Sequence, residues 1–274
     1  MLSRRALIGS SLLAAGPKAS LAPRSALAAE PRFTVPAARL FAHRGFGTLG
    51  APNALSPENT LAGFRRAASL GVTYLETDVQ STRDGVPVLM HDATVDRTTD
   101  GHGPLRELTA EQVAGLNAAS GFAGFAGREP VPTFAQYLAL LAELGATAVP
   151  EVKSARRPEE IAQLLGLAEA AGMADRVIWQ SRRLPTLAEI ARQRGGRARL
   201  ALIRNDLKDL EALAELPGEK TLILRATPLL RGEIAPDAVR NRGVQLVPWT
   251  VNHAEAAQRL LAAGCEFLLS DGPV

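Results

Sequence analysis

The sequence predicts an α/β fold in which eight parallel strands close into a (β/α)8 barrel with helices on its outer face. Short apolar runs alternate with longer helical patterns along most of the chain, and several helical stretches end at glycine, as Ala262-Ala263-Gly264 does. Strands and helices in alternation favour a parallel sheet joined by right-handed crossovers. The chain has 274 residues, close to the about 250 that such a barrel typically takes.

Nine apolar runs have the length of strands, one more than the barrel needs. The runs are Leu40–Ala42, Thr73–Val79, Val86–Met90, Ala148–Lys153, Val177–Gln180, Leu200–Ile203, Thr221–Arg225, Gln245–Val251 and Glu266–Ser270. Six residues, Gln80 to Gly85, separate the second run from the third, whereas a parallel crossover takes a dozen or more. Asp84-Gly85 is also typical of a tight turn. We therefore expect the third run to fold back on the second as a hairpin at the barrel mouth.

Helical patterns lie between these runs. They cover Thr60–Leu70, Thr133–Leu144, Pro158–Ala171, Leu184–Arg194, Leu207–Leu216 and Ala254–Ala263. The longest segment without a strand, from Asp92 to Phe134, is rich in Gly and Thr. Long insertions in compact domains are usually functional, so we expect this one over the catalytic face. Few residues follow the last strand run, so we expect no full closing helix there.

Residues 1–28 have the features of a secretory signal. Arg4 and Arg5 form a twin arginine, an apolar run extends from Ala6 to Ala15, and Ala26-Leu27-Ala28 is a small-residue cleavage pattern. The run is shorter than the ~20 residues that span a bilayer, which disfavours a membrane anchor. We expect export by the twin-arginine route, a periplasmic or extracellular mature protein without a membrane span, and one domain over residues 38–274.

The charge of the mature chain argues against nucleic-acid binding. The whole chain has 31 basic and 28 acidic residues, a net charge of +3. Four of the basic residues and none of the acidic ones lie in residues 1–28, so the remainder has 27 basic and 28 acidic residues and a net charge of −1. The single cysteine, Cys265, lies in an apolar stretch and is interpreted as a small core residue, so no disulfide forms within the chain. The oligomeric state stays open.

Two strand motifs place charged side chains on one face of the sheet. Glu76 and Asp78 are two residues apart, as are Glu151 and Lys153, so each pair points one way. On an exposed strand such pairs could simply face solvent. In a barrel, helices cover the outer face, so the pairs must point into the lumen. Three converging carboxylates need a compensating charge, and oxygen ligands favour one Mg²⁺ or Ca²⁺ over zinc.

Two histidines follow predicted strands at the end where barrel active sites lie. His43 comes directly after the first strand and His91 after the hairpin. Two imidazoles can divide the base and acid roles near neutral pH, whereas His102 and His253 are interpreted as structural or solvated. Arg44 and Lys153 add positive charge, which with a metal ion suits a phosphate.

A series of short motifs resembles those of the glycerophosphodiester phosphodiesterase family, of the phospholipase-C-like TIM-barrel superfamily. The motifs are Ala42-His43-Arg44-Gly45, Pro57-Glu58-Asn59-Thr60, Glu76-Thr77-Asp78-Val79, Thr82-Arg83-Asp84-Gly85, His91-Asp92, Arg97-Thr98-Thr99, Glu151-Val152-Lys153, Trp249-Thr250-Val251-Asn252 and Ser270-Asp271-Gly272-Pro273. Each motif alone is weak, but their order and spacing over residues 38–273 make the resemblance specific. It implies a TIM barrel that hydrolyses glycerophosphodiesters to sn-glycerol 3-phosphate and an alcohol.

The resemblance also implies roles for the matching residues. It assigns acid/base catalysis to His43 and His91, the divalent cation to Glu76, Asp78 and Glu151, and phosphate contacts to Arg44 and Lys153. Glu58 would orient groups in the site, or would instead favour the start of the next helix. Trp249 would form a wall against the glycerol or alcohol portion, or pack in the core. The family commonly has an aromatic residue where this chain has Arg182, which could alter the leaving-group pocket.

Other functions fit parts of the pattern. A related barrel enzyme of the phospholipase D or sphingomyelinase type would act on intact lipids, although the Pro57–Thr60 segment and the Trp249 motif favour water-soluble diesters. A glycosidase explains Glu76 and Glu151 but leaves the histidines and Lys153 without roles. A non-catalytic exported binding protein leaves the acid/base and metal residues unused. The nucleophile is water or the neighbouring glycerol hydroxyl, and proximity favours the hydroxyl.

Overall fold

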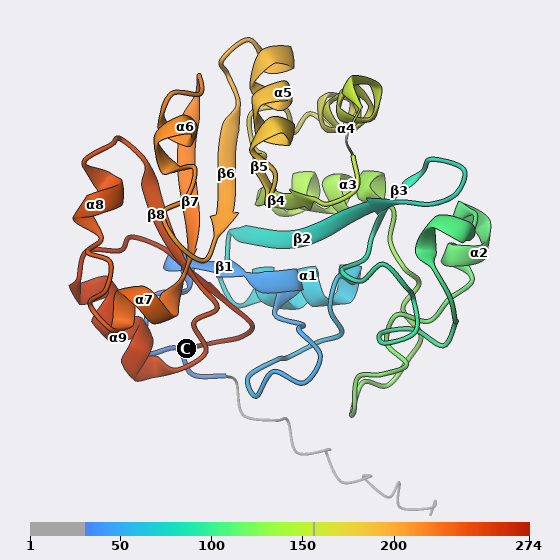
Figure 1. Cartoon of the computed structure of the whole chain (residues 1–274). Helices are drawn as coiled ribbons and strands as arrows, with labels where there is room; N and C mark the ends of the chain where they lie inside the picture. The colour runs from blue at the N-terminus through green and yellow to red at the C-terminus, as the bar shows by residue number, and fades with distance from the viewer. Residues whose placement is uncertain (1–30, 156) are drawn as a thin grey trace, which may run out of the picture. The chain divides into compact units, whose positions relative to one another are not determined.

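Eight parallel strands form the expected barrel in this computed structural model, which describes residues 31–155 and 157–274 (Figure 1). The predicted signal segment, residues 1–28, lies outside the described residues. The strands are β1 (Leu40–Ala42), β2 (Tyr74–Ser81), β4 (Thr147–Val152), β5 (Ile178–Ser181), β6 (Arg199–Arg204), β7 (Glu219–Arg225), β8 (Gln245–Trp249) and β9 (Leu268–Ser270). Their order is β8-β7-β6-β5-β4-β2-β1-β9. A hydrogen bond from Val251 N to Leu269 O, 2.9 Å long, links the two ends of this order.

The remaining strand forms the predicted hairpin. Strand β3 (Pro87–Leu89) runs antiparallel to β2, with Val79 opposite Leu89 and Ser81 opposite Pro87. This pairing extends β2 to Ser81, two residues beyond the predicted end. The hairpin therefore carries the chain directly from the mouth of β2 to His91.

Helices cover the outer face of the barrel between successive strands, except α2, which lies in the insertion between β3 and α3. The helices are α1 (Leu61–Ser69), α2 (Ala110–Ala114), α3 (Phe134–Leu144), α4 (Pro158–Ala170), α5 (Leu184–Arg194), α6 (Leu210–Ala214), α7 (Ala226–Leu230), α8 (Asp237–Arg240) and α9 (Ala254–Ala262), with 3-10 turns at Ala37–Arg39, His43–Gly45 and Leu105–Glu107. Helix α3 shows why the sequence predicts helix ends. The Thr133 side chain accepts a hydrogen bond from Gln136 N at the start of the helix, and Gly145 ends the helix with a φ of +68°. Helices α2, α7 and α8 have no counterpart among the predicted helical patterns, since each is only four or five residues long; α7 and α8 also carry prolines at or near their starts.

Apolar side chains pack on both faces of the strands. Leu75, Val79 and Val152 belong to the large cluster between strands and helices. A second cluster fills the barrel interior with Phe41, Val149, Ile178, Ala201, Ile203, Ile223, Val247 and Leu269. Phe41 stacks on Tyr74 with ring centroids 4.6 Å apart. Tyr74 packs against this inner cluster. Since strand side chains alternate between faces, Glu76 and Asp78, which follow Tyr74 by two and four positions on β2, also point inward.

The insertion between β3 and α3 builds a small core of its own beside the barrel mouth. Val88, Met90, Val95, Leu105, Val113, Ala118 and Val131 form it. After β9, Val274 O accepts hydrogen bonds from Thr34 N and Val35 N at 2.8 and 3.2 Å, which tie this segment to the residues before β1.

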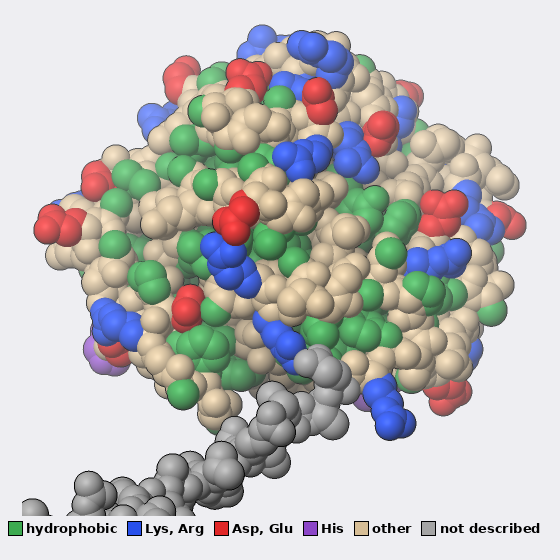
Figure 2. All heavy atoms as spheres, turned by 180° about the vertical axis from the view of Figure 1, so that it is seen from behind, with side chains coloured by type: hydrophobic (Ala, Val, Ile, Leu, Met, Phe, Trp, Pro, Cys, Tyr) green, Lys and Arg blue, Asp and Glu red, His purple; other side chains and the backbone are tan. Residues whose placement is uncertain are grey.

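Charged side chains of both signs are scattered over the face of the molecule seen in Figure 2. Over the part of the chain that the structure describes, no helix is both long and apolar enough to cross a membrane.

Candidate active site

A pocket lies at the carboxyl ends of the barrel strands and gathers the predicted residues. It is lined by His43, Arg44, Glu76, His91, Glu151, Gln180, Arg182, Ile203, Ile223, Trp249 and Leu269. The three other predicted residues contact this lining. Glu58 and Asp78 pair with Arg44, and Lys153 pairs with Asp78 and Glu151. The barrel thus brings all nine predicted residues to one site.

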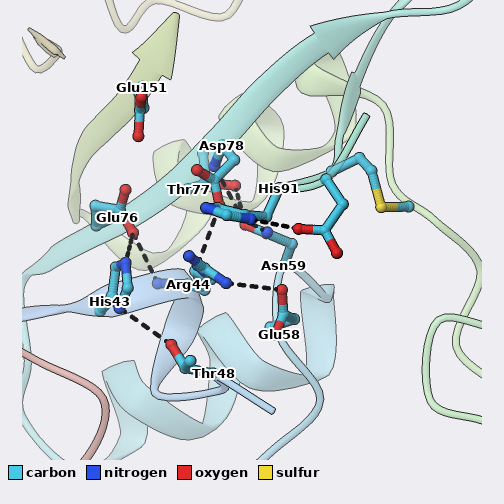
Figure 3. Close-up of polar contacts among 12 residues, drawn as sticks. His43, Arg44, Thr48, Glu58, Asn59, Glu76, Thr77, Asp78, His91 and Glu151 are labelled. Atoms are coloured by element: carbon cyan, nitrogen blue, oxygen red, sulfur yellow. Dashed lines mark hydrogen bonds and ion pairs between the residues drawn. The ribbon is translucent and has the colours of Figure 1, made fainter. Parts of the chain in front are cut away.

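Three buried carboxylates meet above β2 and β4. Parallel pairing sets Asp78 opposite Glu151, and one oxygen each from Glu76, Asp78 and Glu151 lies within 4.8 Å of the others (Figure 3). Burial raises the pKa of Glu76 to about 7 despite the opposing charge of His43. Burial also raises the pKa of Glu151. The pKa of Asp78 is instead lowered, because Arg44 and Lys153 outweigh the effect of burial.

These carboxylates fit a hard divalent cation. They offer oxygen atoms only, which Mg²⁺ and Ca²⁺ prefer, and their side chains are at most 10% exposed. Burial is the main cause of the raised pKa values of Glu76 and Glu151, and the neighbouring cationic groups do not offset it, so a bound cation would favour the ionised carboxylates. The nearest ammonium, Lys153 Nζ, lies 3.1 Å from Asp78 Oδ1.

His43 is held by an aspartate from the opposite end of the chain. Its Nδ1 lies 2.5 Å from Asp271 Oδ1, and Thr48 Oγ1 donates to the same oxygen. This leaves Nε2 on the side of Glu76, 3.9 Å from Oε2. Burial opposes protonation of the ring, but Glu76 and Asp271 outweigh it and raise the pKa of His43. Gly272 makes the approach possible, since a Cβ there would lie 1.8 Å from Asn53 O.

His91 has a similar carboxylate partner but a different environment. Its Nδ1 lies 2.6 Å from Asp92 Oδ1, and its side chain is 35% exposed. Burial together with Arg44 and Lys153 lowers the pKa of His91, against the opposing effect of Asp78 and Asp92. Both histidines therefore present Nε2 to the pocket while Nδ1 faces an acid.

Glu58 links the insertion to Arg44 at the edge of the pocket. Arg97 donates two hydrogen bonds to its carboxylate, at 2.7 and 2.8 Å, and a third to Asp92 at 2.5 Å. Arg44 Nη1 donates to Glu58 Oε1 at 3.0 Å. Burial opposes ionisation, but the two arginines lower the pKa of Glu58. Thr60, rather than Glu58, caps helix α1.

Arg44 occupies a strained turn that fixes its position. Its φ of 50° and ψ of 33° lie in the left-handed region, as does Gly45 with a φ of +74°; non-glycine residues there are uncommon and concentrate at functional sites. Arg44 N donates to Glu76 Oε2 at 2.8 Å, and Arg44 O accepts from Asn59 N at 3.1 Å. Its Nε forms an ion pair with Asp78 Oδ2 at 3.2 Å.

Several residues without a predicted role hold the carboxylates in place. Asn59 donates to Asp78 Oδ2 at 3.1 Å and accepts from Thr77 Oγ1 at 2.7 Å. Gln180 donates to Glu76 Oε1 at 2.5 Å. Asn59 lies within a recognised motif, and Gln180 has the inward-facing parity of Ile178. These two signals could have suggested both residues, as the Ser270–Pro273 motif could have suggested Asp271.

The other side of the pocket is apolar and basic. Ile203, Ile223 and Trp249 line it from β6, β7 and β8. Arg182 extends from the end of β5, with Cζ 5.1 Å from the centre of the Trp249 ring and Nε 3.7 Å from Glu151 Oε1. The Trp249 indole N–H is buried without an acceptor among the described residues.

Comparison with known proteins identifies relatives along nearly the whole domain. The model of the glycerophosphoryl diester phosphodiesterase family matches residues 43–274. A glycerophosphodiester phosphodiesterase from Caldanaerobacter subterraneus is 31% identical over 224 residues, which cover 79% of this chain and 89% of the relative. Glycerophosphodiester phosphodiesterase 1 of Rattus norvegicus is 60% identical over 79 residues, covering 29% of this chain and 22% of that protein.

The fold has a solved counterpart as well. A phosphodiesterase of Oleispira antarctica, in complex with the product sn-glycerol-3-phosphate, superposes on this chain with a TM-score of 0.75 and 23% identity. The match covers 86% of this chain and 93% of the other.

Proposed function

Because the chain belongs to the glycerophosphoryl diester phosphodiesterase family of hydrolases, we propose that it cleaves glycerophosphodiesters to sn-glycerol 3-phosphate and an alcohol, with His43 and His91 as the acid/base pair and one Mg²⁺ or Ca²⁺ as cofactor. One observation carries this proposal. Three buried carboxylates and two histidines, each backed by an acid, converge on one pocket at the carboxyl ends of the strands.

Positive groups would bind the bridging phosphate between the two histidines. Arg44 lines the pocket and is oriented by Glu58, which supports a positioning role for that acid. Lys153 Nζ lies 3.1 Å from Asp78 and 3.9 Å from Glu151, next to the proposed cation site. A cation held by Glu76, Asp78 and Glu151 would stabilise the negative charge that develops on the phosphate oxygens.

The histidines would move the two protons of the reaction. One imidazole takes a proton from the attacking hydroxyl or water, and the other gives one to the leaving alcohol. Asp271 would orient His43, and Asp92 would orient His91. Each aspartate accepts a hydrogen bond from Nδ1 of its histidine, which leaves Nε2 to face the substrate. Trp249, with Ile203 and Ile223, forms the apolar wall for one substituent of the phosphate.

A direct assay tests this function. Purified protein is incubated with glycerophosphoethanolamine in Mg²⁺ or Ca²⁺ and in excess chelator, and release of glycerol 3-phosphate is measured. We expect turnover with metal, loss in chelator, and recovery on adding metal back. His43→Ala and His91→Ala should each lower kcat at least ~10²-fold, while His102→Ala, on the exposed insertion, should not.

Two outcomes would contradict the proposal. Full activity in excess chelator would refute the cation, and turnover of phospholipid vesicles without turnover of soluble diesters would point to a lipid-cleaving enzyme instead.

A further inference from the structure

The two sides of the pocket differ in charge. The β1, β2 and β4 side carries the carboxylates and His43, and it accounts for the phosphate and the proposed cation. The β5 to β8 side carries no acid among the residues that line it. A diester that places its phosphate on the first side must direct one substituent toward the second.

Two arginines flank the aromatic wall on this second side. Trp249 pairs in register with Arg225 at the end of β7, and the Arg225 Cζ lies 5.7 Å from the centre of its ring. Arg182 Cζ lies 5.1 Å from the same centre and also lines the pocket. The indole ring holds both guanidinium groups near the pocket by cation–π contact. Their positive charges therefore lie beside the substituent that contacts Trp249.

Both guanidinium groups keep their hydrogen-bonding capacity. Over the described residues, neither the Arg182 nor the Arg225 side chain donates a hydrogen bond, and the acid paired with Arg182, Glu151, is 3.7 Å away. The Arg182 side chain is 49% exposed. Arg204, on the strand between them, is by contrast engaged by Asp209 and by the Arg182 carbonyl. Arginine with unused donors at a pocket edge binds carboxylate or phosphate groups.

We propose, on the basis of the function proposed above, that this chain prefers glycerophosphodiesters whose alcohol carries an anionic group, a carboxylate or a further phosphate, which Arg182 binds with the support of Arg225. A trimethylammonium group such as that of choline would meet two positive charges there instead. Arg182 and Arg225 are thus specificity residues rather than parts of the acid/base machinery.

A matched pair of substrates isolates the anionic group. Glycerophosphoserine and glycerophosphoethanolamine differ by one carboxylate, so the ratio of their kcat/KM values cancels effects on the shared phosphate and metal. We expect wild type to favour the serine diester at least about tenfold, and Arg182→Gln to reduce the ratio about tenfold. Arg225→Gln should reduce this ratio less than Arg182→Gln does, only severalfold, because Arg225 does not line the pocket. Arg182→Glu should reverse the preference.

Arg183→Gln is the control. Arg183 is the exposed neighbour of Arg182 and does not line the pocket, so this variant should keep the wild-type ratio. A wild-type ratio near one, or a ratio that Arg182→Gln leaves unchanged while both diesters are cleaved, would overturn the inference alone. Failure to cleave any glycerophosphodiester with metal present would instead overturn the proposed function and the inference with it.

Discussion

Replacing Asp271 by Asn tests how the barrel orients His43. The Asp271 carboxylate serves three donors: His43 and Thr48 at Oδ1, and the Asn252 amide at Oδ2, 2.5 Å away. An asparagine amide has one acceptor oxygen. In either orientation of the new amide, its N–H₂ group replaces one carboxylate oxygen and faces a hydrogen-bond donor. If the N–H₂ group faces His43, the imidazole loses the acceptor that keeps its proton on Nδ1.

The cost can be estimated from the contacts. A hydrogen bond to a charged group contributes about 1.5–3 kcal/mol, and the Asp271 side chain is only 7% exposed, so water cannot easily replace it. At about 1.4 kcal/mol for each factor of ten, kcat should fall about 10- to 10²-fold. The Asp271 charge and hydrogen bond raise the pKa of His43, so the limb of the pH–rate profile due to His43 should move to lower pH.

The assay is release of glycerol 3-phosphate in saturating metal, from about pH 5 to 9, where imidazoles titrate. Asp237→Asn, at an exposed aspartate of α8 paired with Arg240, is the matched control and should behave as wild type. A variant that is merely less stable would lose activity without moving the pH profile. If Asp271→Asn keeps kcat within about twofold and the profile stays in place, the proposed orientation of His43 by Asp271 is wrong.

Two further predictions concern stability. In chelator, the pKa of Glu76 is about 7 in the folded protein against 4.5 when unperturbed. The contribution of protonated Glu76 to the free energy of unfolding is therefore fully present below pH 4.5 and is lost as the pH rises through 7. Urea unfolding should show that Glu76→Gln removes this pH-dependent loss, on the order of 3 kcal/mol, and parallel pH dependences of the two proteins would contradict this. Tyr137→Phe should lower the free energy of unfolding by about 1–3 kcal/mol, because its buried hydroxyl donates to Leu75 O and accepts from Val149 N at 3.2 Å. Tyr74→Phe is the control, because the Tyr74 hydroxyl has no such pair of partners among the described residues. Equal losses in the two variants would argue against the bridge formed by Tyr137.

The period-two pattern accounts for most of what could be predicted about the site. Once β2 and β4 were recognised as barrel strands, Glu76, Asp78 and Glu151 had to share the lumen, because helices cover the other face. The short loop before Val86 likewise required the hairpin that places His91 at the mouth. These inferences needed local spacing only.

Other features depend on contacts between distant parts of the chain. Asp271 and Arg182 have the same inward-facing parity as Leu269 and Gln180, but parity says nothing about which strands are neighbours or how they are staggered. Helices α2, α7 and α8 and the short form of α6 could not be predicted, because their patterns are only about one turn long, too short for a helical period to stand out.

By itself the sequence determined the strand–helix alternation, the hairpin, the inward-facing carboxylates and the family resemblance, because each depends on residue types at short spacing. The tertiary structure alone decided that Asp271 meets His43 across 228 positions of sequence, that Arg97 of the insertion reaches Glu58, and that Arg182 and Arg225 share the ring of Trp249. Those contacts follow from barrel closure and strand stagger, which bring together residues that no local pattern connects.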